Sequence, residues 1–192
     1  DDYLVLDNVG SNTAFQFANT ANFTLEAWVN RGSVSSTHST IISKQNTGVA
    51  GNYILSITPT GEPRIYREAI PGGLSATTSL PLNEWHHIAG VFDGTSLKLY
   101  IDGVLNNSLT TSGNVVSNVT TIKVAIGASY TSSTPINFFN GGVDEVRVWN
   151  VARTATQIRQ SFNTQLQGNE SNLVGYYNFN QGVAAGDRKS VV

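Results

Sequence analysis

The sequence contains no cysteine and no methionine, and it is poor in charged residues. Without cysteine there can be no disulfide, no thiolate ligand for a metal and no cysteine nucleophile. Charged residues make up only 12% of the 192 residues, which is about half of the usual share. Asn, Ser, Thr and Gly take their place, a composition common among secreted and cell-surface β-proteins. The composition therefore favours an extracellular or cell-surface location.

Several classes of function are disfavoured by what is missing. The formal net charge is −2 and no cluster of Lys and Arg occurs, so a phosphate-tracking surface for nucleic acid is not expected. No apolar run is long enough for a membrane-spanning helix, and membrane insertion is not expected either. His86 and His87 are neighbours in a predicted strand and point to opposite faces. Since His38 lies far away in the sequence, no zinc cluster is predicted.

The clearest structural signal lies in residues 85–107. It predicts three consecutive antiparallel strands, with turns at Asp93-Gly94 and Asp102-Gly103, where glycine adopts a positive φ without strain. In the middle strand, Leu97 and Leu99 alternate with polar residues, the pattern of a strand with one buried face. Residues 85–92 are apolar at both parities, which indicates a central strand covered on both sides.

Alternating apolar residues elsewhere predict an all-β chain. Further strands are expected at residues 3–6, 15–17, 23–30, 40–45, 53–58, 64–69, 75–79, 121–128, 142–150 and 173–180, with turns at 8–12 and long loops at 46–52 and 130–140. Residues 154–157 match a capping box, and Ile158 and Phe162 follow four apart, so one short helix is expected. This number of strands predicts two packed antiparallel sheets in a β-sandwich.

The order of these segments is similar to that of a known family. Residues 23–29, 42–44, 85–93, 99–103, 142–150 and 173–179 together resemble the laminin-G-like jelly roll of the concanavalin A-like lectin/glucanase superfamily, to which the pentraxins are related. The resemblance implies a jelly-roll sandwich of two curved sheets. Members bind sugars, other proteins or calcium, and some cleave glycans; the fold does not specify which.

The resemblance covers residues 1–182, which we expect to form one domain. Residues 183–192 are expected to be a linker or a domain boundary, because the chain departs from the family pattern after Asn180, where relatives continue into a closing strand. The first residues already have a strand-like pattern, which favours a domain from a larger multidomain protein.

The resemblance also implies a structural calcium site. Asp144 opens a strand in the position where glycan-cleaving relatives hold calcium, and the matching partners would be Asp2 and the loop that ends at Asn22. Calcium accepts such mixtures of carboxylate and carbonyl oxygens. The alternative is that Asp144 only accepts a hydrogen bond from a backbone amide in a turn.

Two carboxylates, Glu26 and Glu145, occupy predicted strands near Arg147. A pair of carboxylates at a suitable separation could act as a glycosidase acid and base. The favoured interpretation is an ion-pair lattice around Arg147, because the alternating acid motif of the glucanase relatives is missing. No catalytic residue is therefore predicted.

Aromatic side chains in loops are the remaining candidates for ligand contacts. Sugars present C–H faces that stack on aromatic rings, while polar side chains bind their hydroxyl groups. Tyr130, Tyr66 and Arg67 are the predicted ligand-binding residues. The favoured function is a non-catalytic extracellular module for carbohydrate recognition or adhesion, with a glycan or an extracellular protein as its partner. A structural or protein-interaction domain without sugar binding is the alternative, and a glycan-cleaving enzyme is less favoured.

Overall fold

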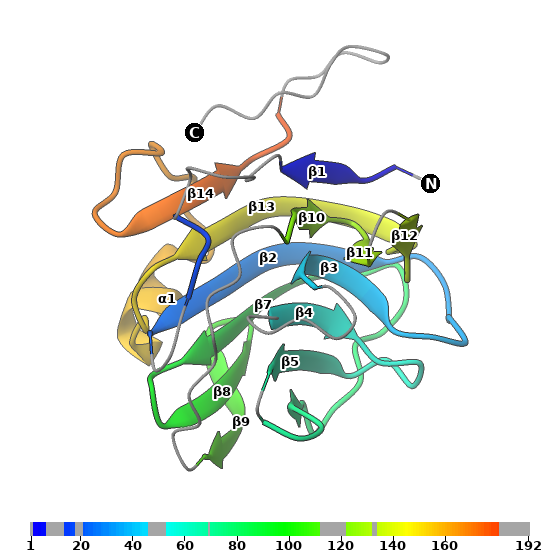
Figure 1. Cartoon of the computed structure of the whole chain (residues 1–192), viewed down its shortest axis with the longest axis horizontal. Helices are drawn as coiled ribbons and strands as arrows, with labels where there is room; N and C mark the ends of the chain where they lie inside the picture. Colours follow the sequence, from blue (N-terminus) through cyan, green and yellow to red (C-terminus); the bar gives the residue numbers. More distant parts are fainter. Residues whose placement is uncertain are drawn as a thin grey trace.

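The computed structural model describes residues 2–6, 14–17, 21–45, 53–68, 70–111, 122–131 and 134–180. In these ranges two six-stranded antiparallel sheets form a sandwich (Figure 1). Sheet A has the spatial order β1 (Leu4–Leu6), β10 (Val124–Ile126), β3 (Ser39–Lys44), β4 (Tyr53–Ile57), β5 (Pro63–Arg67) and β6 (Leu74–Ser75). Sheet B has the order β14 (Leu173–Tyr177), β13 (Gly141–Trp149), β2 (Phe23–Arg31), β7 (Trp85–Phe92), β8 (Ser96–Ile101) and β9 (Val104–Thr110). The predicted two-sheet jelly-roll sandwich is thereby confirmed.

The core lies between the two sheets and follows the alternation of the strands. In β2, Phe23, Leu25, Ala27 and Val29 are fully buried in it, and the residues between them face outward. The sheets approach closely at Gly90, where a Cβ atom would lie 2.8 Å from Cδ1 of Ile65. A glycine in the middle of β7 is thus required by packing, because any side chain there would push the sheets apart.

The predicted meander is β7–β8–β9, and its turn residues have the expected backbone. Gly94, Asp102 and Gly103 have φ values of 92°, 50° and 76°. β7 is central, between β2 and β8, and its two histidines point to opposite faces as expected. His87 is buried on the outer face, whereas Nδ1 of His86 lies 2.8 Å from Oδ2 of Asp102.

The single helix, α1 (Ala155–Ser161), begins with the predicted capping box, in which Thr154 and Gln157 bond reciprocally. Its buried residue, Ile158, packs against Ala89, Val91 and Tyr100 on the outer face of sheet B. The helix therefore covers one end of that face. Among the described helical residues, no segment is long and apolar enough to cross a bilayer.

The structure also corrects some local predictions. Residues 130–140 are not one loop, because β11 (Ser129–Thr131) pairs with β12 (Thr134–Ile136) in a separate hairpin. Phe15 and Phe17 are not in a strand; both anchor a turn and its flank in the core, where burial rather than pairing holds them. The predictions for residues 8–12, 46–52 and 183–192 lie outside the described residues.

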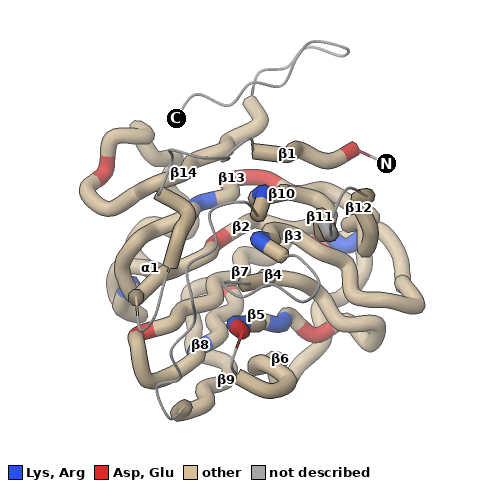
Figure 2. Tube along the Cα trace, in the orientation of Figure 1, with Lys and Arg blue, Asp and Glu red and all other residues tan. Residues whose placement is uncertain are grey.

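Charged residues are distributed along both sheets and α1 (Figure 2). Figure 2 shows no stripe of Lys and Arg along the described part of the chain, which agrees with the low net charge.

Candidate functional site

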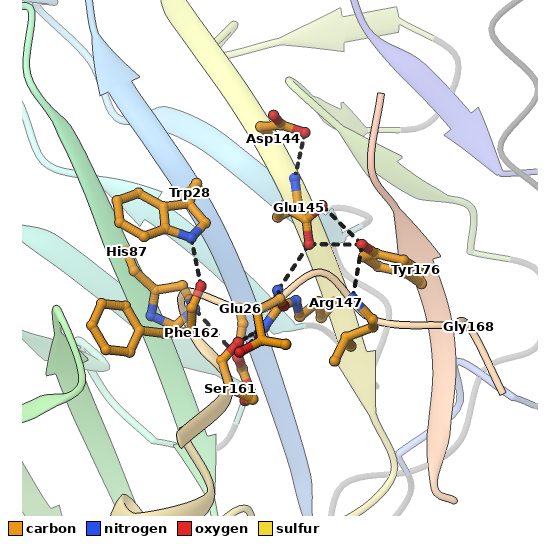
Figure 3. A network of polar contacts seen from close by, with 12 residues as sticks. Glu26, Trp28, His87, Asp144, Glu145, Arg147, Ser161, Phe162, Gly168 and Tyr176 are labelled. Carbon is orange, nitrogen blue, oxygen red and sulfur yellow. Dashed lines mark hydrogen bonds and ion pairs between the residues drawn. The ribbon is translucent and has the colours of Figure 1, made fainter. Parts of the chain in front are cut away.

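A network of polar contacts lies on the outer face of sheet B, beneath α1 and the segment that follows it (Figure 3). Its centre is Glu26 in β2, whose side chain is fully buried. Oε1 of Glu26 accepts a 2.8 Å hydrogen bond from Arg153, and Oε2 lies 3.3 Å from Nε2 of His87 and 3.8 Å from Arg147. Burial alone would raise the pKa of Glu26, but His87 and Arg153 outweigh it and hold the pKa below its usual value. Glu26 is therefore a buried anion that neighbouring cations neutralise.

Arg147 connects this carboxylate to the segment after α1. Its guanidinium donates to Oε2 of Glu145 at 2.8 Å and to the carbonyls of Ser161 and Thr164 at 2.9 and 2.7 Å. Glu145 in turn accepts from the hydroxyl of Tyr176 at 2.8 Å. Burial, together with this hydrogen bond and the charge of Glu145, raises the pKa of Tyr176 to about 12.

The network is suited to holding structure rather than to acid–base catalysis. A general acid or base must reach the proton that it transfers, yet Glu26 is inaccessible and Glu145 is committed to Arg147 and Tyr176. What the network does is fasten the segment 150–170 to sheet B, since Trp28 also donates to the carbonyl of Phe162 at 2.8 Å. The predicted ion-pair lattice around Arg147 is confirmed.

A β-bulge in β13 shapes the neighbouring surface. Asp144 pairs with Trp28 and Arg147 with Glu26, so β13 has one residue more than β2 between these pairs. Glu145 has a φ of 50°, and Oδ1 of Asp144 accepts its backbone N–H at 2.7 Å. Strict alternation would put Asp144 and Arg147 on opposite faces, but the extra residue brings both to the outer face.

The three predicted calcium ligands do not converge. Asn22 lies six residues before Trp28, the partner of Asp144, which corresponds to about 20 Å at the rise of a strand. Asp2 belongs to the segment of sheet A beside Gly127. As a set, these residues do not fit one ion, because one ion's ligands lie about 2.3–2.6 Å from it. Calcium bound by Asp144 with other oxygens stays a prediction, and the described residues contain no group of three His, Asp or Glu side chains placed for a metal.

Two of the predicted sugar contacts point to opposite faces of sheet A. Tyr66 and Arg67 are consecutive in β5, within the strand expected at residues 64–69, so they point in opposite directions. Arg67 is directed into the core, 2% exposed, and donates to the carbonyl of Phe17 at 3.0 Å. Its contact with a ligand stays a prediction. Tyr66 is half-buried on the outer face, where the guanidinium of Arg64 lies 5.3 Å from its ring centre.

Tyr130 lies in β11 of the hairpin, and Nζ of Lys123 is 5.5 Å from its ring centre. Each of these two tyrosines thus has a cation over one face of its ring. Arg64 was not among the predicted residues; its position two before Tyr66 in a strand was the available signal.

Trp85 is the largest exposed aromatic side chain among the described residues, at 48% exposure, and was not among the predicted site residues. It pairs with Asn30, which pairs with Gly142, so these residues form one row across β7, β2 and β13. A Cβ atom on Gly142 would lie 2.7 Å from Cη2 of Trp85. Since neighbouring strands are about 4.8 Å apart, the indole must lie along the sheet, over Asn30, to reach Gly142. We call Trp85, Asn30, Gly142 and Asp144 the Trp85 platform.

The Trp85 platform is the uncovered end of the outer face of sheet B. Along β7 the outward residues run from Val91 and Ala89, beneath α1, to His87, against Phe162, and then to Trp85. In Figure 1 α1 lies at the left end of this sheet, and β2 continues to the other end. Sequence alternation puts Trp85 outward, but whether a helix covers it depends on tertiary structure.

Comparisons with known proteins agree with this architecture. A laminin G-like family model, described as the concanavalin A-like lectin/glucanases superfamily, matches residues 1–159. No curated protein matches the chain. A candidate carbohydrate-binding protein from Bacteroides ovatus ATCC 8483 has a TM-score of 0.75 and 23% identity over 97% of this chain and 52% of its own. The chain thus spans about half the length of that protein.

Two further solved structures share the fold. Domain 4 of AbnA, a GH43 extracellular arabinanase from Geobacillus stearothermophilus, in complex with arabinotriose, has a TM-score of 0.56 and 21% identity over 74% of this chain and 66% of its own. A heptameric SAP-like pentraxin from Limulus polyphemus has a TM-score of 0.56 and 15% identity over 75% and 70%. At these identities the likeness is one of fold. The match of the family model, over most of the chain, shows that this protein belongs to the concanavalin A-like lectin/glucanases superfamily.

Proposed function

We propose that this domain is a non-catalytic carbohydrate-recognition module that acts outside the cell or at its surface, as part of a larger protein. The observation that carries the proposal is the Trp85 platform, in which an exposed indole reaches across the sheet from β7 to Gly142 in β13. The similarity to a candidate carbohydrate-binding protein and to an arabinanase domain in complex with arabinotriose supports it.

The platform has the two components that sugar binding needs. The Trp85 indole reaches Gly142 with its outer ring edge and remains 48% exposed, so it offers an apolar surface for the C–H face of a sugar ring. Asp144 follows Gly142 by two residues on the same face of β13, about 7 Å along the strand. Its carboxylate can accept hydrogen bonds from sugar hydroxyl groups beside the stacked ring.

Hydrolysis is disfavoured by the state of the carboxylates. Glu26 and Glu145, the two that a glycosidase mechanism would need, are held in ion pairs beneath the segment 150–170. We expect Glu145→Gln to change the stability of the domain without loss of glycan binding. Neither the wild type nor this variant should hydrolyse glycans.

A protein-interaction domain is the second candidate function, favoured by one observation. The edge strand β9 carries no charge, and Val104, Leu105 and Leu109 are exposed on it. Edge strands of this kind can pair with another chain.

A glycan array, probed in calcium and again in a chelator, separates the two candidates. The wild-type domain should bind saccharides, and Trp85→Ala should lose at least tenfold in affinity, since stacking contributes about 1.5 kcal/mol or more. Tyr3→Ala is the matched control, because Tyr3 is also exposed but lies just before β1 of sheet A. Tyr66→Ala and Tyr130→Ala test the other predicted contacts, and loss of binding in the chelator alone would support calcium.

A second variant tests the orientation of the indole. Gly142→Ala keeps Trp85 but adds a Cβ atom where the ring lies, so it should lift the indole from the sheet and weaken binding. Circular dichroism confirms that each variant is folded. Absence of binding by the folded wild type, or binding that Trp85→Ala leaves unchanged, would contradict the proposed site.

A further inference from the structure

The one charged group of the Trp85 platform is negative. Asp144 is half-buried at its edge and is part of no ion pair within the described residues; one of its oxygens accepts the N–H of Glu145. Glu84 precedes Trp85, but its carboxylate lies 3.9 Å from Nε2 of His86, which points to the opposite face. The carboxylate of Asp144 is therefore the charge that a ligand on the indole would meet.

No compensating cation faces the platform from the elements packed around it, as far as the structure describes them. On β13, Arg147 is 1% exposed and bonded to Glu145 and to two carbonyls. On β2, Arg31 is buried and donates to the carbonyl of Leu80. Arg153 pairs with Glu26 next to α1, at the covered end of the face.

Arg147 carries the nearest cation along β13, and its burial makes this guanidinium unavailable to a bound anion. Its donors are directed to acceptors within the protein, and the segment 161–164 lies over it. A carboxylate of a bound sugar would therefore meet Asp144 but no partner of opposite charge among the described residues. Bringing an anion to such a place leaves its charge unpaired and adds repulsion.

We propose that the Trp85 platform selects uncharged saccharides and discriminates against sugars that carry a carboxylate, such as uronic and sialic acids. This inference rests on the proposed function of the same site. Asp144 has two roles in it: its lone pairs accept hydroxyl hydrogens of a neutral sugar, and its charge repels an acidic one. Asp144→Asn would keep an oxygen that accepts the Glu145 N–H while removing the charge.

The test compares oligosaccharides of equal length that differ only in charge. Isothermal titration at low ionic strength would measure binding of neutral xylo- or gluco-oligosaccharides and of the same chains carrying a glucuronic acid substituent or a terminal sialic acid. The neutral chains should bind about tenfold more tightly, the effect of roughly 1.4 kcal/mol of repulsion. The difference in affinity between neutral and acidic chains should become smaller in about 0.5 M salt, where charges at the surface are screened.

One variant assigns the effect to Asp144. Asp144→Asn should narrow the ratio of neutral to acidic affinity, and this ratio is the readout, because the variant also removes a charged acceptor of sugar hydroxyl groups and weakens neutral binding. Lys98→Gln is the control, because Lys98 pairs with Asp93 in the β7–β8 turn away from the platform, and it should leave the preference unchanged. Circular dichroism of each variant shows that the fold is intact.

The outcomes separate this inference from the proposed function. Acidic chains that bind as tightly as neutral ones, or a ratio of affinities that Asp144→Asn leaves intact, would overturn the charge selectivity while the recognition function stands. If the folded wild type binds no saccharide of either kind, both proposals fail.

Discussion

Replacing Lys44 by methionine should stabilise this domain at neutral pH. Lys44 is in β3 between Val124 and Tyr53, two core residues, so its side chain is directed between the sheets. It is 1% exposed, and Nζ has no hydrogen-bond partner among the described residues. Burial, and to a lesser extent the charge of Arg67, lowers the pKa of Lys44 from 10.5 to about 8.

The sign of the effect follows from the direction of the shift. The folded state holds the proton of Lys44 less tightly than the unfolded state, so below pH 8 folding must bury a charge. This penalty is relieved as the pH rises from about 8 to about 10.5. The shift corresponds to at most ~3.4 kcal/mol, and we expect about 2 kcal/mol because water and relaxation screen such sites.

Chemical denaturation at several pH values measures this directly. Lys44→Met should exceed the wild type by about 2 kcal/mol in free energy of unfolding at pH 7, and the excess should decline between pH 8 and 10.5. Comparing both proteins at each pH cancels the ionisation of other groups. Lys98→Met is the control: Asp93 raises the pKa of Lys98 through a 2.6 Å contact, so this variant should be neutral or slightly destabilised. A destabilised Lys44→Met with no dependence on pH in that window would refute the reasoning.

Three further predictions concern sheet B. Glu26→Gln should lower the free energy of unfolding by about 3 kcal/mol at pH 7, because it leaves Arg153 and its neighbours without their buried anion. Since the pKa of Glu26 is lowered, this loss of stability should become smaller as the pH drops below 4.5. Equal denaturation midpoints of variant and wild type at pH 7 would contradict the prediction. Asp144→Asn should raise the melting temperature in a chelator, because burial and the charge of Glu145 raise the pKa of Asp144, so that folding with this carboxylate ionised costs stability. If Asp144 binds calcium, added calcium should stabilise only the wild type. A lower melting temperature of the variant in the chelator would contradict the expected stabilisation. Thr154→Ala should lower the free energy of unfolding by about 1 kcal/mol, because it removes the N-cap of α1. Thermal unfolding measures this, with Thr156→Ala as the control, since the same change at an exposed position within the helix should not destabilise the domain. An unchanged melting temperature for Thr154→Ala would show that the cap does not stabilise the helix.

Much of the fold could be predicted because its signals are local. The alternation in β2, the Asp-Gly turns of the meander and the capping box before α1 each depend on residues a few positions apart. The hairpin β11–β12 was missed because its strands are three residues long and carry no regular alternation. Phe15 and Phe17 imitate a strand, since burial at alternate positions produces the same pattern without pairing.

The candidate site was less predictable, because it depends on which strands are neighbours. Tyr66 and Arg67 looked equivalent in the sequence, yet strand alternation sends one to the outer face and the other into the core. The bulge at Glu145 could not be read from the sequence either, since it appears only when β13 is aligned with β2. It moves Asp144 to the face on which Trp85 lies.

The sequence by itself determined that this is an all-β sandwich with a central meander, because apolar periodicity and turn chemistry are properties of short segments. It also determined the superfamily, through the order of those segments. Only the tertiary structure decided which residues are free to meet a ligand. Packing of α1 and the segment that follows it buries His87 and Arg147 and leaves Trp85 open two residues further along the strand, and exposure of this kind is set by contacts between residues distant in the chain.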